Sequence, residues 1–375
     1  MIGAGGHESF QGCIQHAKTY RNPSALAGKK VLVVGVGNSA LDISLEVARS
    51  GATSVEVAAR SGTTVIPVSD YYGSPCDHLL LNRFWEVLPV KLRLLAFFTV
   101  VQKTNKLFQA AGLQAPPKEY AHGHFSNLKE HAAYRDMLDS GRIRIRPGLK
   151  ELSGTMARFS DGSTSEVDHI ICCTGYKLNF KYLEESVRQE AVVQRTTERD
   201  GKTFNLQYMK LYRHVLHPVH PTLAFLGIVL TYGNESCVGE MQARWALSLW
   251  KGTAVPPSQL EFDSHIASVQ RSAEEKTPKF SQFVNYVKYM DLLARDIGCQ
   301  PRYRALAEPW LTWKLFSAPV VPAQYRLKGP HAWDGAAAFI KTQPSVISNV
   351  LRIAYAQPGS PGASYVEPLR VQAKL

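Results

Sequence analysis

The hydrophobic and polar positions follow a regular order from Lys29 onwards. Residues 31–34 form a continuous apolar run, which predicts a strand buried on both faces. Over residues 41–48 the apolar positions recur at helical spacing, and Gly51 favours the end of that helix. Residues 54–59 return to a strand-like pattern. The order strand, helix, strand predicts a βαβ unit, so we expect an α/β fold with a Rossmann-like domain.

Later segments carry patterns of more than one kind. Residues 142–146 alternate arginine and isoleucine, which predicts a strand stopped by the Pro-Gly pair that follows. Asp161 and Gly162 predict a hairpin turn between residues 157–159 and 167–172. A helix ending at Gly298 is predicted from an apolar face made of Phe283, Val287, Met290, Ala294 and Ile297.

Other stretches are less regular. Residues 1–27 are polar and are interpreted as irregular, and residues 71–135 are interpreted as helical with loops. The tail 357–375 is rich in proline, glycine and serine, which predicts disorder.

A glycine pattern, Gly-x-Gly-x-x-Ala, follows the first predicted strand. Gly35 allows the tight turn from strand to helix, Gly37 lets the backbone approach a pyrophosphate, and Ala40 lets the helix pack closely on the sheet. The helix N-terminus offers N–H groups to phosphates, and Asn38 and Ser39 can add hydrogen bonds. A purely structural glycine turn is the alternative. The strand before the pattern and the helix after it favour a dinucleotide site.

The end of the second predicted strand bears on the choice of nucleotide. NAD sites usually carry a carboxylate there for the ribose hydroxyls, whereas this chain has Arg60 between Ala59 and Ser61. The planar guanidinium of Arg60 can pair with a 2′-phosphate, although a surface arginine is the alternative. Glu56 lies earlier on the strand. This position therefore favours NADP.

Composition narrows the class of protein. The 375 residues suffice for two domains, and the formal net charge of +12 would suit an anionic cofactor, an acidic membrane surface or nucleic acid. We find no nucleic-acid motif. The six cysteines show no zinc-type pairing, and His122, His124 and His131 lack a carboxylate or cysteine to complete a site, so we expect no metal.

The longest apolar run, residues 94–101, is far shorter than the roughly 20 residues that a membrane-spanning helix needs. With no signal peptide at the start, we expect a cytoplasmic protein. Peripheral contact with the endoplasmic reticulum membrane stays open.

Four residues before the glycine loop carry a specific motif. Phe10, Gly12, His16 and Tyr20 fit the spacing Phe-x-Gly-x-x-x-His-x-x-x-Tyr. This resembles the identifying motif of the flavin-containing monooxygenases. Three further segments resemble that family in its own order, namely Val167–Tyr176, Glu240–Trp245 and Gln324–Pro330. Tyr20 stands where Baeyer–Villiger members typically carry tryptophan, so the resemblance is to the members that form N-oxides and S-oxides.

The resemblance implies NADP and FAD as cofactors, with a small nucleophilic substrate and molecular oxygen. In the family NADPH reduces FAD, and a flavin hydroperoxide then oxygenates a tertiary amine or a sulfide. Thr174 and Gly175 would help to join the nucleotide domains, and Gln242 would lie on the flavin side. The resemblance assigns no catalytic residue within this chain.

The family's first Gly-x-Gly-x-x-Gly loop, which binds FAD, has no counterpart here, because Gly3–Gly6 lacks a strand before it and a helix after it. We therefore expect a sequence truncated by about one domain, which would expose surface and favour self-association. The expected organisation is a linker with the family motif (1–27), an NADPH-binding Rossmann-like domain (28–176) and the C-terminal portion of a split FAD-binding domain (177–356).

Two other hypotheses remain. The first is a non-catalytic NADP-binding remnant, or an interaction partner of a full-length paralogue. The second is an ordinary NADPH dehydrogenase, which ranks last because no proton-donor signature accompanies the loop.

Overall fold

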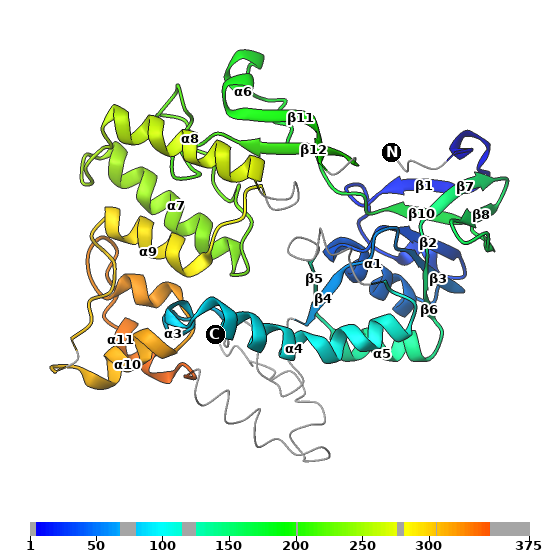
Figure 1. Ribbon diagram of the computed structural model, residues 1–375, viewed down its shortest axis with the longest axis horizontal. Coiled ribbons are helices and arrows are strands. Elements are labelled where there is room, and N and C mark those ends of the chain that lie inside the picture. The colour runs from blue at the N-terminus through cyan, green and yellow to red at the C-terminus, as the bar shows by residue number, and fades with distance from the viewer. Residues whose placement is uncertain are drawn as a thin grey trace. The chain divides into compact units, whose positions relative to one another are not determined.

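The computed structural model describes residues 5–67, 80–114, 125–199, 202–275, 281–304 and 306–345 (Figure 1). By its internal contacts the chain divides into two units. The first comprises Met1–Asp70 and Lys91–Tyr176, and the second comprises Tyr71–Val90 and Lys177–Leu375. His122, His124 and the tail predicted to be disordered lie outside the described residues.

A parallel sheet of five strands is the centre of the first unit (Figure 1). Every neighbouring pair in it is parallel. The helix α1 (Asn38–Arg49) connects two adjacent strands, and Gly51 follows it with a φ of 90°. The predicted α/β fold with a Rossmann-like sheet is confirmed. The strands, in spatial order, are β1 (Cys13–His16), β10 (His169–Cys172), β2 (Lys30–Val34), β3 (Ser54–Ala58) and β6 (Ile143–Arg146).

Side chains alternate along each strand, so the two faces of this sheet pack against different elements. Val31 and Val33 of β2 share a core with α1 and α5 (His131–Asp139). Leu32 and Val34 share the opposite core with a three-stranded antiparallel sheet. That sheet consists of β7 (Leu149–Ser153), β8 (Met156–Phe159) and β9 (Thr164–Glu166).

Two sequence interpretations are wrong. Residues 1–27 are not irregular throughout, because Cys13–His16 form edge strand β1, paired with β10. An edge strand with exposed positions has no continuous apolar run to reveal it. The hairpin at Asp161 and Gly162 exists, but its second strand is β9. Residues 169–172 belong to the parallel sheet instead, because Ile170 and Ile171 are buried on both faces.

The interpretation of residues 71–135 as helical with loops is right for part of that segment. It contains α3 (Arg83–Val87), α4 (Val90–Ala110) and α5. The interpretation does not include the two-stranded parallel sheet that β5 (Phe125–Leu128) forms with β4 (Thr64–Pro67). No described helix is long and apolar enough to cross a membrane.

Helices dominate the second unit, around a core that includes the buried Trp245. The predicted helix near the C-terminal end is α9 (Tyr286–Asp296), followed by Gly298, but Phe283 lies ahead of its N-cap, Asn285. The remaining regular elements of this unit are α6 (Glu185–Ala191), β11 (Val192–Arg199), β12 (Lys202–Met209), α7 (Glu235–Trp250), α8 (Gln259–Glu275), α10 (Pro309–Ser317) and α11 (Ala336–Thr342). Short 3-10 helices occupy His7–Ser9, Ser24–Leu26 and Pro322–Arg326.

Candidate functional site

A cavity of about 170 Å³ lies within the first unit, where β1, β2 and β10 end. Parallel strands place their carboxyl ends at one edge of a sheet, which is where ligands of open α/β folds bind. Three motifs that are far apart in the sequence meet there. The cavity is lined by His16, Ala17, Gly37, Asn38, Ser39, Cys173, Gly175 and Tyr176.

The two loop glycines, Gly35 and Gly37, have different structural roles. Gly35 has a φ of 117°, and a Cβ there would lie 2.5 Å from the carbonyl oxygen of Cys173. Gly35 therefore brings β2 and the end of β10 close together. Gly37 is the N-cap of α1 with an extended backbone, and a Cβ there would meet no atom within 4 Å. Gly37 thus leaves space for a ligand at the helix N-terminus.

The first turn of α1 supports phosphate binding. No side chain caps it, and the N–H groups of Ala40 and Leu41 donate to the Gly37 carbonyl. Among the described backbone bonds, the N–H groups of Asn38 and Ser39 have no acceptor. Ala40 is fully buried against the sheet, as predicted for close helix packing. The Asn38 Oδ1 accepts from the N–H of Asn127 at 2.9 Å, which ties the loop to β5.

His16 connects the family motif to the end of β10. Its Nδ1 accepts the N–H of Lys18 at 3.0 Å, so the ring proton must lie on Nε2, which donates to the Gly175 carbonyl at 3.1 Å. The ring of Tyr176 meets the His16 ring edge to face, with centroids 5.5 Å apart. Thr174 and Gly175 are exposed, and Gly175 has a φ of 90°.

The other motif residues lie outside the cavity. A Cβ at Gly12 would come within 2.4 Å of the Asp168 carbonyl oxygen, and Phe10 packs against the core beneath the sheet. The Tyr20 hydroxyl donates to Glu46 of α1 at 2.9 Å, and burial raises the pKa of Tyr20 well above its usual range. These three residues fix the path of β1, and only His16 of the motif faces the cavity.

Arg60 is exposed just beyond β3. Its side chain lies over Gly148, where an added Cβ would come 3.1 Å from the Arg60 Cγ. Among the described residues no hydrogen bond or ion pair engages its guanidinium. Arg60 is therefore available to an anion, as a contact with a 2′-phosphate requires.

Gln242 has different surroundings. It lies on α7 in the second unit and is fully buried. Its Oε1 accepts from the Gly227 N–H at 2.7 Å, and its Nε2 donates to the Tyr289 hydroxyl at 2.8 Å. These two hydrogen bonds connect α7 to Gly227 and to Tyr289 of α9 inside that unit.

Sequence reasoning missed two features of the first unit. Cys173 lines the cavity, and burial raises the pKa of its thiol to about 12, so the thiol stays neutral. The second feature is Arg146, because the alternating pattern of residues 142–146 predicts a strand but no ion pair. Arg146 pairs with the buried Glu56 at 2.7 Å. In the register of β3 and β6, Glu56 lies opposite Arg144, which is two residues before Arg146.

One histidine cluster in the described residues has metal-like spacing, with ligand atoms of Glu190, His217 and His220 within 4.8 Å of one another. His217 cannot supply a lone pair, however. Its Nδ1 accepts from the N–H groups of Val219 and His220, and its Nε2 faces the Val187 carbonyl at 2.8 Å. The chemistry of this cluster is that of a hydrogen-bonded turn rather than a metal centre.

The fold and the site define an α/β protein with a Rossmann-like parallel sheet and a cavity at the N-terminus of α1. A sequence model described as flavin-binding monooxygenase-like matches residues 3–367. The chain therefore belongs to this family, as its motifs predicted. Flavin-containing monooxygenase 5 of Oryctolagus cuniculus is 32% identical over 90% of this chain, and the N-oxide-forming dimethylaniline monooxygenase 2 of Rattus norvegicus is 32% identical over 92%.

The chain spans 62% and 63% of the lengths of these two relatives. Among solved structures, the closed crystal structure of cyclohexanone monooxygenase is similar with a TM-score of 0.50 and 12% identity. That match covers 78% of this chain and 69% of the other. At this identity the similarity concerns the fold alone.

Proposed function

We propose that this protein uses NADPH and FAD to transfer one oxygen atom from O2 to a soft nucleophile, such as a tertiary amine nitrogen or a sulfide sulfur. The second oxygen atom leaves as water, and NADPH supplies the two electrons. The observation that carries the proposal is the cavity where the Gly35–Ala40 loop, His16 and Gly175 meet. Membership of the flavin-binding monooxygenase-like family supports the reaction type.

The residues of the cavity fit a pyrophosphate. The space at Gly37 and the N–H groups of Asn38 and Ser39 would hold it, with the partial positive charge of the α1 N-terminus. Arg60 would bind the 2′-phosphate that distinguishes NADP from NAD. His16 would hold the Gly175 carbonyl, and with it the Thr174–Gly175 turn, in a fixed orientation.

The Gln242 amide is bonded to Gly227 and Tyr289, so its part toward FAD would be to hold these two residues in place. When bound, the two cofactors supply hydride transfer and oxygen activation, while the protein orients them and excludes water. We propose Thr174 and Gly175 as the junction of the nucleotide sites and Gln242 as support on the flavin side. No described side chain is assigned as catalytic.

The name of the Rattus norvegicus relative supports amine nitrogen as a target. The proposed location is the cytoplasm, with peripheral contact at the endoplasmic reticulum membrane.

A second candidate is a non-catalytic NADP-binding protein, which the occupied Gln242 amide favours. Flavin retention separates the two candidates. The purified protein is incubated with FAD, freed of unbound flavin and examined by visible absorption. Retained flavin absorbance supports the monooxygenase, whereas a colourless protein that still binds NADP+ supports the second candidate.

The nucleotide choice is tested by titrating NADP+ and NAD+. We expect Arg60→Ala to weaken NADP+ binding about tenfold and to leave NAD+ unchanged. Arg142→Ala, which removes another exposed arginine of the same unit, is the matched control. An equal effect of Arg60→Ala on both nucleotides would overturn the assignment.

A further inference from the structure

A second cavity, of about 560 Å³, lies wholly within the second unit. This volume falls in the range of about 300–1,000 Å³ that small-molecule sites occupy. Three helices each present one face to it, with residues at helical spacing. The lining comprises Arg83, Glu86 and Val87 of α3, Val287, Lys288 and Asp291 of α9, Thr312, Trp313 and Phe316 of α10, and Tyr303 from the preceding loop.

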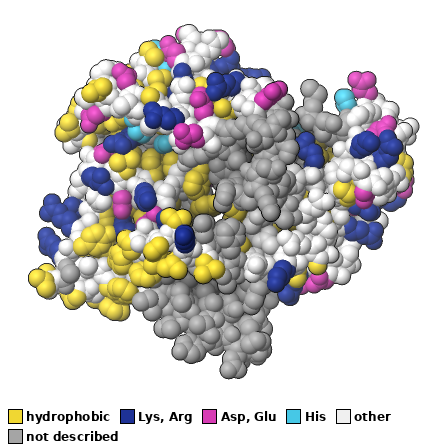
Figure 2. All heavy atoms as spheres, viewed as in Figure 1, with side chains coloured by type: hydrophobic (Ala, Val, Ile, Leu, Met, Phe, Trp, Pro, Cys, Tyr) yellow, Lys and Arg dark blue, Asp and Glu magenta, His cyan; other side chains and the backbone are white. Residues whose placement is uncertain are grey.

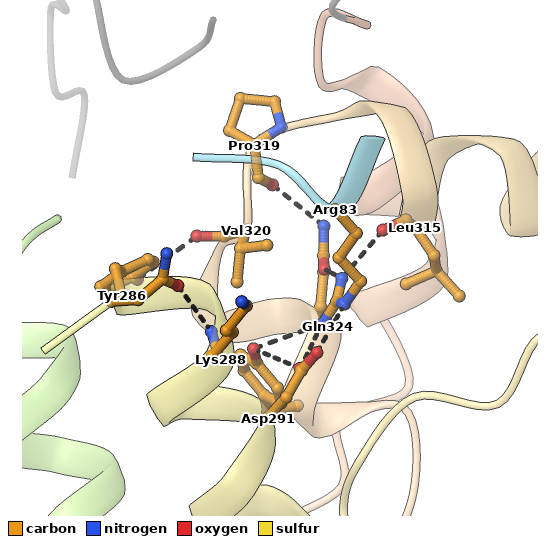
Figure 3. A network of polar contacts seen from close by, with 10 residues as sticks. Arg83, Tyr286, Lys288, Asp291, Leu315, Pro319, Val320 and Gln324 are labelled. Atoms are coloured by element: carbon orange, nitrogen blue, oxygen red, sulfur yellow. Dashed lines mark hydrogen bonds and ion pairs between the residues drawn. The ribbon is translucent and has the colours of Figure 1, made fainter. Parts of the chain in front are cut away.

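The charged lining of this cavity is neutralised from within (Figure 3). The Arg83 guanidinium donates to both carboxylate oxygens of Asp291, from Nε at 2.9 Å and from Nη2 at 2.6 Å. Its Nη1 donates to the Leu315 carbonyl at 2.8 Å. The Tyr325 hydroxyl adds a third donor to Asp291 at 2.8 Å. This pair is largely buried and leaves no net charge for a ligand to compensate.

The remaining two charges also pair with each other. Glu86 lies 3.6 Å from the Lys288 Nζ, and it accepts a hydrogen bond from Asn285 Nδ2 at 2.8 Å. Two cations and two anions therefore cancel within the lining. A charged ligand would lose its hydration here without gaining an unpaired partner.

The rest of the lining is apolar or aromatic. Trp313 and Phe316 are half-buried on α10, and Val287 is buried on α9. Hydrophobic side chains gather on the surface over α3 and α10 (Figure 2), where Val87 is 66% exposed. Among the described residues, no hydrogen bond engages the Tyr303 hydroxyl or the Trp313 indole N–H. Each is therefore free to donate to a weakly polar group.

We propose that this cavity binds an uncharged, largely apolar small molecule with an aromatic ring. The paired charges of the lining exclude ions, and the rings of Tyr303, Trp313 and Phe316 suit an aromatic ligand. The site is independent of the nucleotide cavity, because the two lie in different units.

The test uses a matched pair of fluorescent probes, neutral N-phenyl-1-naphthylamine and its anionic analogue 8-anilino-1-naphthalenesulfonate. Both are titrated against the whole protein without nucleotide. We expect saturable binding of the neutral probe at one site, at least about tenfold tighter than the anion, because the sulfonate must be desolvated. NADP+ should not displace the neutral probe.

Two matched variants locate the binding. Val87→Trp puts a larger side chain into the lining of the cavity and should weaken binding of the neutral probe about tenfold. Val90→Trp alters another exposed valine, one that does not line the cavity, and should leave binding unchanged. If Val87→Trp fails to fold, Lys288→Trp enlarges another side chain of the lining, one that is exposed. Non-saturable binding, a preference for the anion, or equal effects of the Val87 and Val90 variants would overturn the proposal.

Discussion

At the scale of single residues, the two loop glycines separate stability from binding. Gly35 needs a left-handed backbone and has no room for a Cβ, whereas Gly37 has an ordinary backbone and open space. We expect Gly35→Ala to lower the free energy of unfolding by about 2 kcal/mol or more. Gly37→Ala should cost less than about 1 kcal/mol but weaken NADP+ binding roughly tenfold.

Urea denaturation and NADP+ titration of both variants check this prediction. Each variant is the control for the other, since the substitution is the same and the positions are two residues apart. Loss of NADP+ binding without loss of stability in Gly35→Ala would contradict the assigned roles.

At the scale of elements, Arg83 connects α3 to α9 and α10 (Figure 3). Arg83→Met would leave the largely buried carboxylate of Asp291 without its cation. We expect a loss of about 3–5 kcal/mol in the free energy of unfolding. Removing Arg326, whose partner Glu240 is more exposed, should cost less than about 1 kcal/mol.

Tryptophan fluorescence during urea denaturation follows the unfolding of the second unit, because all six tryptophans belong to that unit. The double variant Arg83→Met with Asp291→Leu should recover part of the stability, since no charge is then left unpaired. A double variant no more stable than Arg83→Met alone would speak against the ion pair as the anchor.

The helix α8 carries a histidine, His265, that is neutral in the folded protein. Burial, and to a lesser degree the charge of Arg213, lowers the pKa of His265 from 6.5 to about 4. The unfolded chain binds this proton near pH 6.5 and the folded protein binds it near pH 4. Between these values the unfolded state holds more protons, so the free energy of unfolding falls as the pH drops from 6.5 to 4. The loss is up to about 3 kcal/mol.

Chemical denaturation at several pH values, compared between the parent protein and His265→Gln, isolates this contribution. The stability difference between the two should change across pH 6.5 to 4 and stay constant above it. A constant difference over the whole range would refute the neutral, buried state of His265.

At the scale of the whole molecule, the two units have separate cores and separate cavities. Hydrogen exchange should therefore report two local responses. NADP+ should slow exchange at residues 35–40 and 173–176, and N-phenyl-1-naphthylamine should slow exchange in α9 and α10. Protection of the same segments by both ligands would contradict the assignment of two sites.

The sequence predicted the first unit well where its elements are defined by local pattern. A buried strand, a glycine turn and an amphipathic helix each leave a signature within a few residues, so β2, α1 and the loop between them were found. The motif spacing also found His16, which the structure brings to the loop.

The features that the sequence did not predict depend on contacts between residues that are distant in the chain. β1 is recognisable only from its pairing with β10, more than 150 residues later, and β4 only from its pairing with β5. The use of the Gln242 amide depends on Gly227 and Tyr289, which no motif connects to it. The second cavity is built by helices that are likewise separated along the chain.

The central proposal is that this protein oxygenates soft nucleophiles with NADPH and FAD, and isotope transfer tests it most directly. The protein is loaded with FAD and supplied with NADPH and methyl phenyl sulfide under isotopically labelled O2, and the sulfoxide is analysed by mass spectrometry. The account predicts one labelled oxygen atom per sulfoxide, formed only with NADPH and more slowly in Gly37→Ala. A flavin-loaded protein that yields no labelled sulfoxide would contradict it.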